Sequence, residues 1–263
     1  MEMWKTFEFN LIRFFFSVIF LFTAGPCPAQ PQSEVNRYEL PTIRNGEFVI
    51  EYHGFALSYD ESRHVPLWVA YELTSDETDG DFSRSGKVFL NDNSVSVVQA
   101  DGYDFRGTGW SRGHMAPAAD FKWSDEGMTD TFYYTNVCPQ DPQLNNRYWN
   151  TLENKVRGWA RSYGGVFVVT GPVFGEGVFG KIGYHEVQVP DAFFKAVLVR
   201  DGEGFKSIAF LMDNTPDPRH LKDCVLTVNA LEDLTGIDFF PSLDDCLEEE
   251  VEDQLDARSW GVY

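Results

Sequence analysis

Basic residues are scarce in this sequence. Its 263 residues include 21 lysines and arginines against 41 aspartates and glutamates, which gives a formal net charge of −20 at pH 7. A broad basic surface that slides along a polyanion is therefore not expected, because such binding depends on many lysines and arginines. A few arginines could still converge on one phosphate, since much of the acid is segregated. The block from Asp244 to Asp256 is typical of the solvated face of a C-terminal helix.

Cysteine is also rare, with four residues and no Cys-x-x-Cys pair, so structural zinc has little support. The five histidines show no pair at metal-ligand spacing on one helix. Among the cysteines beyond the N-terminal segment, we expect Cys224 and Cys246 to form a disulfide between two C-terminal helices. Cys138 is expected to be a buried small hydrophobe.

The chain lacks an apolar run long enough to cross a bilayer, which takes about 20 residues. Lys5 and Arg13 precede a shorter apolar stretch, Phe14–Phe22, and small or turn-forming residues follow up to Ala29. This layout predicts a signal peptide over residues 1–29, with an uncleaved N-terminal anchor as the alternative. We expect a secreted or periplasmic protein with no stable membrane association once the signal is removed.

Internal repeats and low-complexity linkers are absent after residue 40. We therefore expect one α+β domain over residues 42–263 behind a flexible lead-in over residues 30–41. Apolar residues recur at helical spacing between Asn145 and Tyr163, where Gly164-Gly165 ends the pattern. Strands are expected at 48–52, 55–59, 67–73, 166–170, 193–199 and 205–212, and further helices at 228–235 and 247–255.

The segment Gly109–Gly113 fits the Gly-x-Ser-x-Gly pattern of serine hydrolases, with Ser111 at its centre. That pattern works on a sharp turn between a buried strand and a helix. Here the preceding segment is charged and rich in glycine, so we expect no regular element between Tyr103 and Trp110, and Pro117 follows soon after. A serine hydrolase is therefore the weaker interpretation, and it predicts labelling of Ser111 by an active-site serine reagent.

The same segment offers a different chemistry through Arg112-Gly113-His114. Hydrolysis of a phosphodiester needs a base for the attacking water, a cation to neutralise charge on phosphorus, and help for the leaving oxygen. A histidine beside an arginine supplies the base and a positive neighbour for phosphate. Side chains with oxygen ligands follow in two blocks, Asn136–Gln140 and Leu144–Glu153.

These blocks together resemble the DNA/RNA non-specific endonuclease family, which includes Serratia-type secreted nucleases and mitochondrial endonuclease G. The family signature is Asp-Arg-Gly-His followed by a small-Pro pattern, and Ser111 to Phe121 occupy its place here. Asn-x-x-Pro-Gln and Asn-x-x-x-Trp-x-x-Leu-Glu follow in the family's order, and the likeness runs from about Tyr52 to Phe240. It implies the ββα-metal (His-Me finger) endonuclease fold, with a central, mostly antiparallel sheet flanked by helices.

The resemblance implies a magnesium-dependent endonuclease that hydrolyses DNA and RNA with little sequence preference, with Mn²⁺ as an alternative ion. His114 matches the general base, Asn145 the one protein ligand of the metal, and Glu153 the acid that orients water on the metal. Asn136 matches an asparagine that supports the site. Three further residues match arginines that contact or stabilise the phosphate: Arg84, Arg112 and Arg157.

Helical spacing independently places Glu153 and Arg157 on neighbouring turns beside an apolar stripe. Taken alone, these two would form an ordinary surface ion pair, and Asn145 alone would cap a helix. Ser111 stands where the family signature has aspartate, which could change the loop geometry or the basicity of His114. The alternative function is therefore a catalytically inactive module that binds nucleic acid or protein on the same scaffold. The sequence is compatible with a homodimer under either function.

Overall fold

The computed structural model describes residues 36–263 apart from Glu176 and Pro218. The expected signal peptide over residues 1–29 and the first part of the lead-in lie outside the described residues. Ser33–Tyr263 form one compact unit. Among the helices described, none has the length and apolar character needed to span a membrane.

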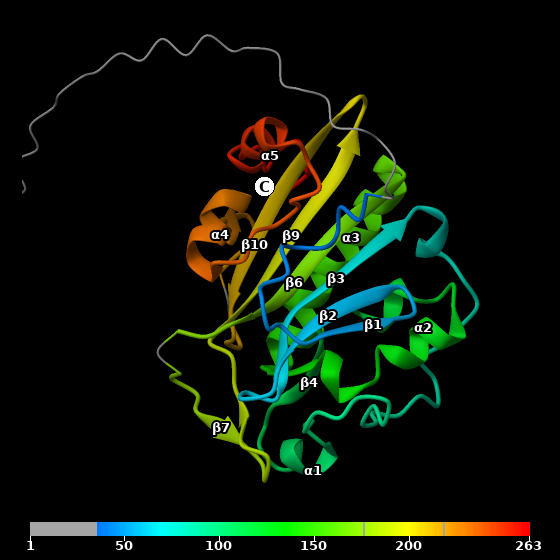
Figure 1. Ribbon diagram of the computed structural model, residues 1–263, viewed down its shortest axis with the longest axis vertical. Coiled ribbons are helices and arrows are strands. Elements are labelled where there is room, and N and C mark those ends of the chain that lie inside the picture. Colours follow the sequence, from blue (N-terminus) through cyan, green and yellow to red (C-terminus); the bar gives the residue numbers. More distant parts are fainter. Residues whose placement is uncertain (1–35, 176, 218) are drawn as a thin grey trace, which may run out of the picture. The chain divides into compact units, whose positions relative to one another are not determined.

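A seven-stranded antiparallel sheet forms the centre of this unit (Figure 1). Its order along the sheet is β1-β2-β3-β6-β9-β10-β11. The turn between β1 and β2 contains Gly54 at φ +96°, a left-handed conformation that glycine adopts without strain. The strands are β1 (Val49–Tyr52), β2 (Phe55–Asp60), β3 (Val65–Thr74), β6 (Gly165–Val173), β9 (Ala192–Asp201), β10 (Gly204–Asp213) and β11 (Val225–Leu226).

The six predicted strands all form, each with ends within three residues of those predicted, and the largest difference is at the end of β6. The sequence predicted that β6 would end at Gly171-Pro172, but the strand continues to Val173. The reason is positional: β3 pairs with β6 only as far as Thr170, and beyond it Pro172 pairs with Phe193 of β9 alone. A proline is tolerated where one side of the strand needs no backbone donor.

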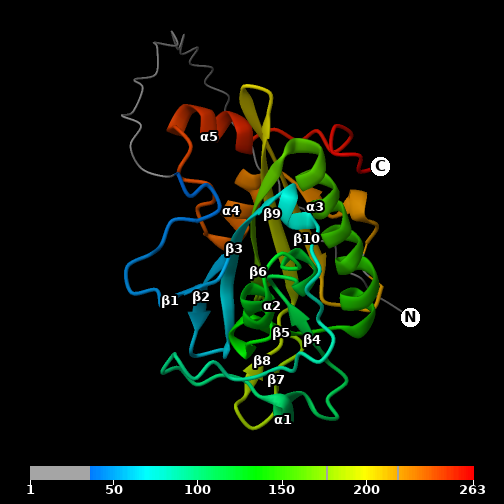
Figure 2. The ribbon, with the colours of Figure 1, turned by 90° about the vertical axis from the view of Figure 1, so that its right-hand side faces the viewer.

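Helices cover both faces of the sheet (Figures 1 and 2). α3 (Asn150–Tyr163) packs against β3, β6 and β9, and its Leu152 shares a core with Phe193. On the other face, α4 (Val228–Thr235) and α5 (Asp245–Glu252) pack against β10, and Leu231 shares a second core with Phe194. Successive side chains of β9 therefore pack into two cores on opposite faces of the sheet, as expected for a sheet buried on both faces.

The remaining elements are short, and several of them pack against β3. α1 (Gly102–Phe105) was not expected, because glycines flank it. Its N-terminus carries a capping box in which the Asp101 side chain accepts from Tyr103 N and Asp104 N, and the Asp104 side chain accepts from Asp101 N. The others are β4 (Ser111–His114), α2 (Asp125–Asp130), β5 (Val137–Gln140), β7 (Lys181–Ile182) and β8 (Val187–Gln188), with short turns η1 (Asp76–Thr78), η2 (Ala118–Asp120), η3 (Tyr134–Asn136), η4 (Leu144–Trp149) and η5 (Leu221–Asp223).

The cysteines correct one prediction. Cys224 is a buried free thiol that lies 3.5 Å from the Arg219 carbonyl oxygen, so the expected Cys224–Cys246 disulfide is wrong. Cys224 belongs to the core on the α3 face, whereas α5, which carries Cys246, packs on the opposite face of the sheet. Cys138 is fully buried in the α3-face core, which confirms its expected role as a small hydrophobe.

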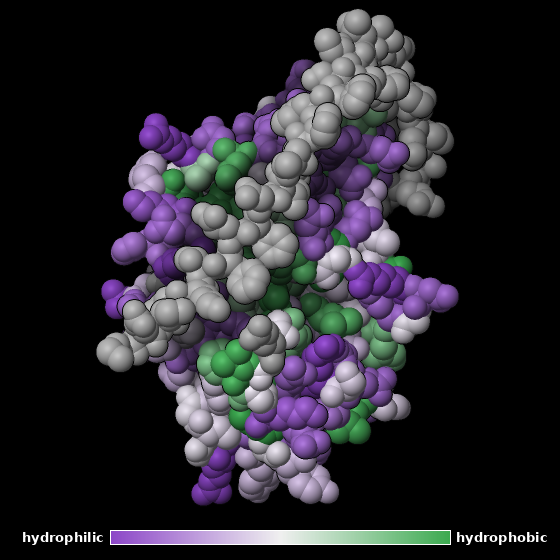
Figure 3. All heavy atoms as spheres, turned by 90° about the vertical axis from the view of Figure 1, so that its left-hand side faces the viewer, coloured by the Kyte–Doolittle hydropathy of each residue, from purple (hydrophilic) through white to green (hydrophobic). Residues whose placement is uncertain are grey.

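The face that carries α4 and α5 presents many hydrophilic side chains around smaller apolar areas (Figure 3). This distribution agrees with the acidic block that the sequence places at the C-terminal helix.

Candidate active site

Two short strands and a long helix bring the predicted residues together. β4 and β5 pair antiparallel, with His114 opposite Val137, and α3 follows β5 in the chain. Gly113 lies opposite Cys138, and a Cβ at Gly113 would overlap the Gln140 side chain. Glycine is therefore required between Arg112 and His114. In chain order, β4, β5 and α3 form a ββα unit.

A π-helical turn, η4, leads into α3 and carries Asn145. The backbone nitrogen of Asn145 donates to the Asp141 carbonyl oxygen, but its side-chain amide makes no hydrogen bond with any residue that the structure describes. Gln143 precedes the turn as its N-cap residue, so Asn145 is not a helix cap. Wide turns of this kind interrupt α-helices most often at functional sites.

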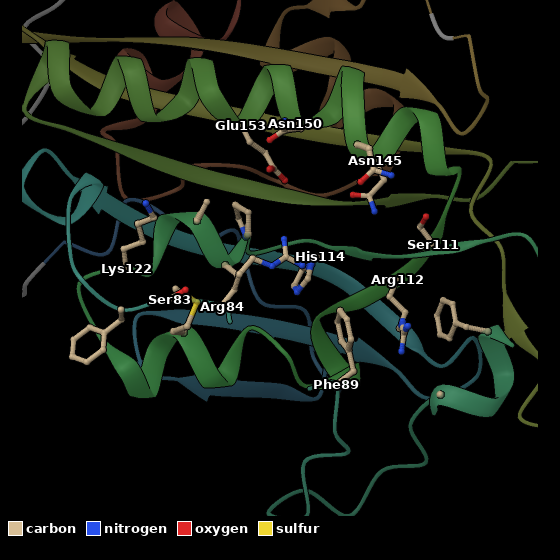
Figure 4. A pocket seen from close by; sticks show the side chains of 18 of the residues that line it. Ser83, Arg84, Phe89, Ser111, Arg112, His114, Lys122, Asn145, Asn150 and Glu153 are labelled. Carbon is tan, nitrogen blue, oxygen red and sulfur yellow. The ribbon is translucent and has the colours of Figure 1, made fainter. Parts of the chain in front are cut away.

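A cavity of about 990 Å³ lies between this helix start and β4. Asn145, Asn150 and Glu153 line it from the helix side, and His114 lies opposite them on β4 (Figure 4). Arg112 of β4 also lines it, with its guanidinium turned toward Phe89. Further cations on its wall are Arg84, Arg106 and Lys122. Five of the residues that the sequence linked to a phosphodiester site therefore line one cavity: Arg84, Arg112, His114, Asn145 and Glu153.

His114 is held between two aromatic rings, with centroid distances of 5.0 Å to Phe89 and 5.1 Å to Phe132. Its Nε2 is buried and has no hydrogen-bond partner among the described residues. Burial and, to a smaller extent, the positive charges of Arg84 and Arg112 together lower the pKa of His114 to about 3. The imidazole is therefore neutral at pH 7 and keeps a lone pair that can accept a proton.

The cations on the cavity wall are not neutralised by the protein. Arg84, Arg106, Arg112 and Lys122 are exposed, and none forms an ion pair within the described part of the chain. Arg112 lies over the Phe89 ring at 4.8 Å, and Arg84 lies 5.9 Å from the centroid of the Phe132 ring. Cations concentrated in this way in an acidic protein favour an anionic ligand.

Glu153 faces the cavity without a hydrogen-bond partner in the described structure. Burial raises its pKa, and the charges of Lys195 and Arg157 act against that rise. Lys195 projects from β9 and is fully buried; its Nζ lies 4.9 Å from the Trp149 ring centroid and has no hydrogen-bond partner among residues 36–263 as described. Burial lowers the pKa of Lys195, and the negative charge of Glu153 opposes that change. Glu153 and Lys195 therefore compensate each other behind the cavity.

Lys195 was missed by the sequence analysis, which treated Phe193–Val199 as an ordinary strand. The available signal was a single lysine inside an otherwise apolar run in a strand buried on both faces. Lysine is almost never fully buried unless it is paired, so such a residue points to a carboxylate nearby.

Arg157 does not line the cavity. Its Nη1 lies 2.5 Å from Asp120 Oδ1, and its Nη2 donates to Asn154 Oδ1 at 2.9 Å. Tyr71 donates to the second Asp120 oxygen at 3.0 Å. The surface ion pair considered for Glu153 and Arg157 is not formed, because Asp120 takes the guanidinium instead.

Asn136 also lies outside the cavity and is completely buried. Its Oδ1 accepts from Ala116 N at 2.8 Å, and its Nδ2 donates to the carbonyl oxygens of Ala116 and Thr131, each at 2.9 Å. These bonds fix the chain two residues after His114. The contacts of Asn136 are therefore those of a residue that positions the histidine strand.

The serine-hydrolase interpretation has no structural support. Ser111 is the first residue of β4, and the chain continues as a strand rather than turning into a helix. A nucleophile elbow requires the opposite order, with a strand before the serine and a helix after it.

Two groups of residues could hold a metal ion. At the cavity, Asn145 and Glu153 offer uncommitted oxygens, which suit an ion that prefers oxygen ligands and keeps several waters. Asp101, Asp104 and His185 also place ligand atoms within 4.8 Å of one another. There, however, both Asp104 oxygens accept hydrogen bonds, from Asp101 N and from the backbone and ring of His185. That cluster ties α1 to the segment between β7 and β8, and the cavity fits a metal better.

Comparisons with known proteins agree with this geometry. A model of the DNA/RNA non-specific endonuclease family matches residues 32–246. Endonuclease G of Bos taurus is 34% identical over 223 residues, which cover 80% of this chain and 74% of that protein. Nuclease EXOG of Xenopus laevis is 32% identical over 235 residues, 84% of this chain and 65% of that protein. The solved structure of EndoG in complex with EndoGI matches with a TM-score of 0.73 and 27% identity, over 81% of this chain and 92% of the matched chain.

The comparisons also correct the expected location. Endonuclease G, nuclease EXOG and nuclease 1 of Schizosaccharomyces pombe are all named as mitochondrial proteins, which contradicts the secreted or periplasmic location. The prediction depended on a short leader of basic and apolar residues, and these features alone do not specify the compartment.

Proposed function

The chain belongs to the DNA/RNA non-specific endonuclease family and is a nuclease, and from this premise we propose that the cavity between β4 and α3 hydrolyses phosphodiester bonds of DNA and RNA with the help of Mg²⁺. One observation carries the proposal: a neutral histidine, unpaired cations and uncommitted oxygen ligands converge on one cavity. The family is metal-dependent, and the choice of Mg²⁺ rests on the ligand types present.

Asn145 would bind the ion directly through its amide oxygen, and Glu153 would hold water molecules that complete the shell. Both side chains face the cavity and have no partner in the described structure. When bound, the ion would neutralise negative charge on the phosphate and on the leaving oxygen.

His114 would act as the general base. It accepts a proton from the attacking water as the water oxygen bonds to phosphorus and the 3′ oxygen leaves. Because Arg84 and Arg112 lower the pKa of His114, a bound phosphate that compensates their charge makes the imidazole a stronger base. The substrate thereby helps to activate the base that deprotonates the attacking water.

Arg112 and Arg84 would contact the phosphate oxygens from the β4 side of the cavity. Arg157 and Asn136 support the site from behind: Arg157 through its ion pair with Asp120, and Asn136 through its bonds to the chain after His114. For Arg157 this replaces the phosphate contact that the resemblance implied.

The second candidate function is a binding module without catalytic activity. Its supporting observation is Ser111, which lines the cavity where the family signature has a carboxylate. The Ser111 hydroxyl cannot supply a fixed negative charge beside the base.

The test is cleavage of supercoiled plasmid and of a structured RNA by the purified full chain, with Mg²⁺ or with EDTA, beside His114→Ala and His220→Ala. His220 is an exposed histidine outside the cavity. We expect cleavage of both substrates in Mg²⁺ only, a loss of about 10²- to 10⁴-fold in His114→Ala, and full activity in His220→Ala. Binding of nucleic acid without cleavage by the folded wild type would establish the second candidate instead.

A further inference from the structure

A second cavity of about 630 Å³ continues the first one around Arg112. The two share Phe89, Gly102, Arg106 and Arg112 as lining residues. The second cavity, called the side groove here, runs between residues 87–91 and α1. A strand whose phosphate occupies the active site would therefore meet the side groove with its neighbouring nucleotides.

The side groove combines apolar and cationic surface. Tyr103, Val88 and Leu90 line it and are unusually exposed for their type, at 78%, 62% and 52%. Arg106 and Arg112 lie along the same groove without ion pairs in the described structure. Its other cation, Lys87, is already bound to Asp125 at 2.7 Å. Contiguous exposed apolar groups on a soluble protein mark a binding surface, and the free arginines select an anionic occupant.

We propose that the side groove binds unpaired nucleotides next to the scissile phosphate, with a base stacked on Tyr103 and the backbone held by Arg106. The inference rests on the proposed function of the adjoining cavity. Unpaired bases fit this surface, because in a duplex the apolar faces of the bases are stacked inside and cannot reach a tyrosine ring. The enzyme thus prefers substrates with single-stranded segments.

The charge pattern favours a nucleic acid strand over a protein as the occupant. The groove is continuous with a cavity built for phosphate, and its two free arginines lie on the shared wall. Stacking on an aromatic ring tolerates every base, which agrees with the non-specific character of the family.

Binding without cleavage tests the inference directly. The probes are a fluorescein-labelled oligothymidylate of twelve nucleotides and the same backbone with abasic sites throughout, titrated with the full chain in EDTA and followed by anisotropy. We expect the wild type to bind the thymidylate at least about fivefold more tightly than the abasic strand. Tyr103→Ala should remove this difference, and Tyr103→Phe should keep it. Tyr263→Ala, at an 86% exposed tyrosine outside both cavities, should behave as wild type.

Arg106→Ala gives a separate signature. It should weaken binding of both strands by the same factor, because a contact to the sugar-phosphate backbone does not depend on the base. It should also reduce the dependence of binding on salt. Equal binding of the two strands by wild type, or an unchanged preference in Tyr103→Ala, would overturn the inference. So would light scattering that shows a dimer broken by Tyr103→Ala, since the groove would then be an interface between copies of the chain. Metal-dependent plasmid cleavage together with equal binding of the thymidylate and abasic strands would leave the proposed function intact and remove only this inference.

Discussion

The active-site cavity and the region between α4 and α5 both hold charged groups without partners, but the signs differ. The cavity sets Arg84 and Arg112 opposite Glu153 and beside a neutral His114. In the α4–α5 region the charged groups that shift the pKa values of Glu248 and Glu252 are all acids, and a buried oxygen of each lacks a hydrogen-bond partner among the described residues.

The carboxyl groups of Glu248 and Glu252 in the α4–α5 region have raised pKa values and so tend to keep their protons. Burial, together with the neighbouring acids Glu232 and Asp238, raises the pKa of Glu252 to about 9 and that of Glu248 to about 7. The cavity charges can instead be compensated by a phosphate and a cation. The net charge of −20 therefore says little about the site, because acid and unpaired cations lie in different places.

The largest effect is expected at the ion pair between Asp120 and Arg157 behind the cavity. Asp120→Asn leaves the Arg157 guanidinium buried without its counter-ion, which should lower the free energy of unfolding by about 3–5 kcal/mol. Urea unfolding followed by circular dichroism measures this. Asp253→Asn, at an exposed aspartate, should change it by less than about 0.5 kcal/mol; equal effects of the two substitutions would contradict the partnered role of Asp120.

Glu153→Gln tests whether the cavity carboxylate serves the ligand. We expect cleavage to fall by about 10- to 100-fold, since the amide holds water around the metal less well. The fold should survive, because a glutamine has nearly the same shape and Lys195, whose pKa burial lowers, can release its proton when Glu153 no longer compensates its charge. Plasmid cleavage and thermal unfolding on the same sample check both parts. Full activity in Glu153→Gln would show that this carboxylate has no role in the reaction.

Glu252→Gln should have the opposite profile, with higher stability and unchanged cleavage. Removing an uncompensated buried carboxylate should raise the free energy of unfolding by about 1–3 kcal/mol at pH 8. The folded pKa lies above the ordinary value of 4.5, so the wild type loses stability as pH rises from about 4.5 to about 9. Thermal unfolding at pH 5 and pH 8 should show this loss in the wild type and a smaller one in the variant. A variant that is less stable at pH 8 would refute this account of the α4–α5 region.

The smallest effect is expected at Lys122, an exposed cavity cation without an ion pair in the described structure. Lys122→Ala should raise the KM for DNA by about threefold at 0.05 M salt, and the difference should fade at 0.3 M because exposed charges are screened. Lys222→Ala removes an exposed lysine outside the cavity and serves as the control. A difference that does not depend on salt would indicate a structural role for Lys122.

Much of the fold could be predicted because the strands and α3 are strongly patterned. α3 was predicted from apolar residues at helical spacing, and Gly164 ends it at φ +83°. α1 could not be predicted, since the glycines around it suggest a loop and only the paired hydrogen bonds between Asp101 and Asp104 define the helix. Short helices held by caps carry little periodic signal.

The cavity residues were predictable only as a compound motif. His114 lies in β4, far in the sequence from Asn145 in η4 and Glu153 in α3, and the structure places all three on one cavity. Arg157 shows the limit of helical spacing: it lies four residues from Glu153, but its partner is Asp120 in η2, which no local pattern indicates. The partner of Lys195 could not be predicted for the same reason, because its compensating charge comes from another element.

The Mg²⁺ concentration that gives half-maximal plasmid cleavage tests the central claim most directly, compared between wild type, Asn145→Ala and Asn146→Ala. Both asparagines line the cavity, but the Asn146 amide already donates to the Pro142 carbonyl oxygen at 2.7 Å. We predict that Asn145→Ala raises this concentration by about tenfold or more, as expected for loss of a metal ligand, while Asn146→Ala stays close to wild type. Cleavage by wild type in EDTA, or an unchanged Mg²⁺ requirement in Asn145→Ala, would contradict the assignment of this cavity as a metal-dependent nuclease site.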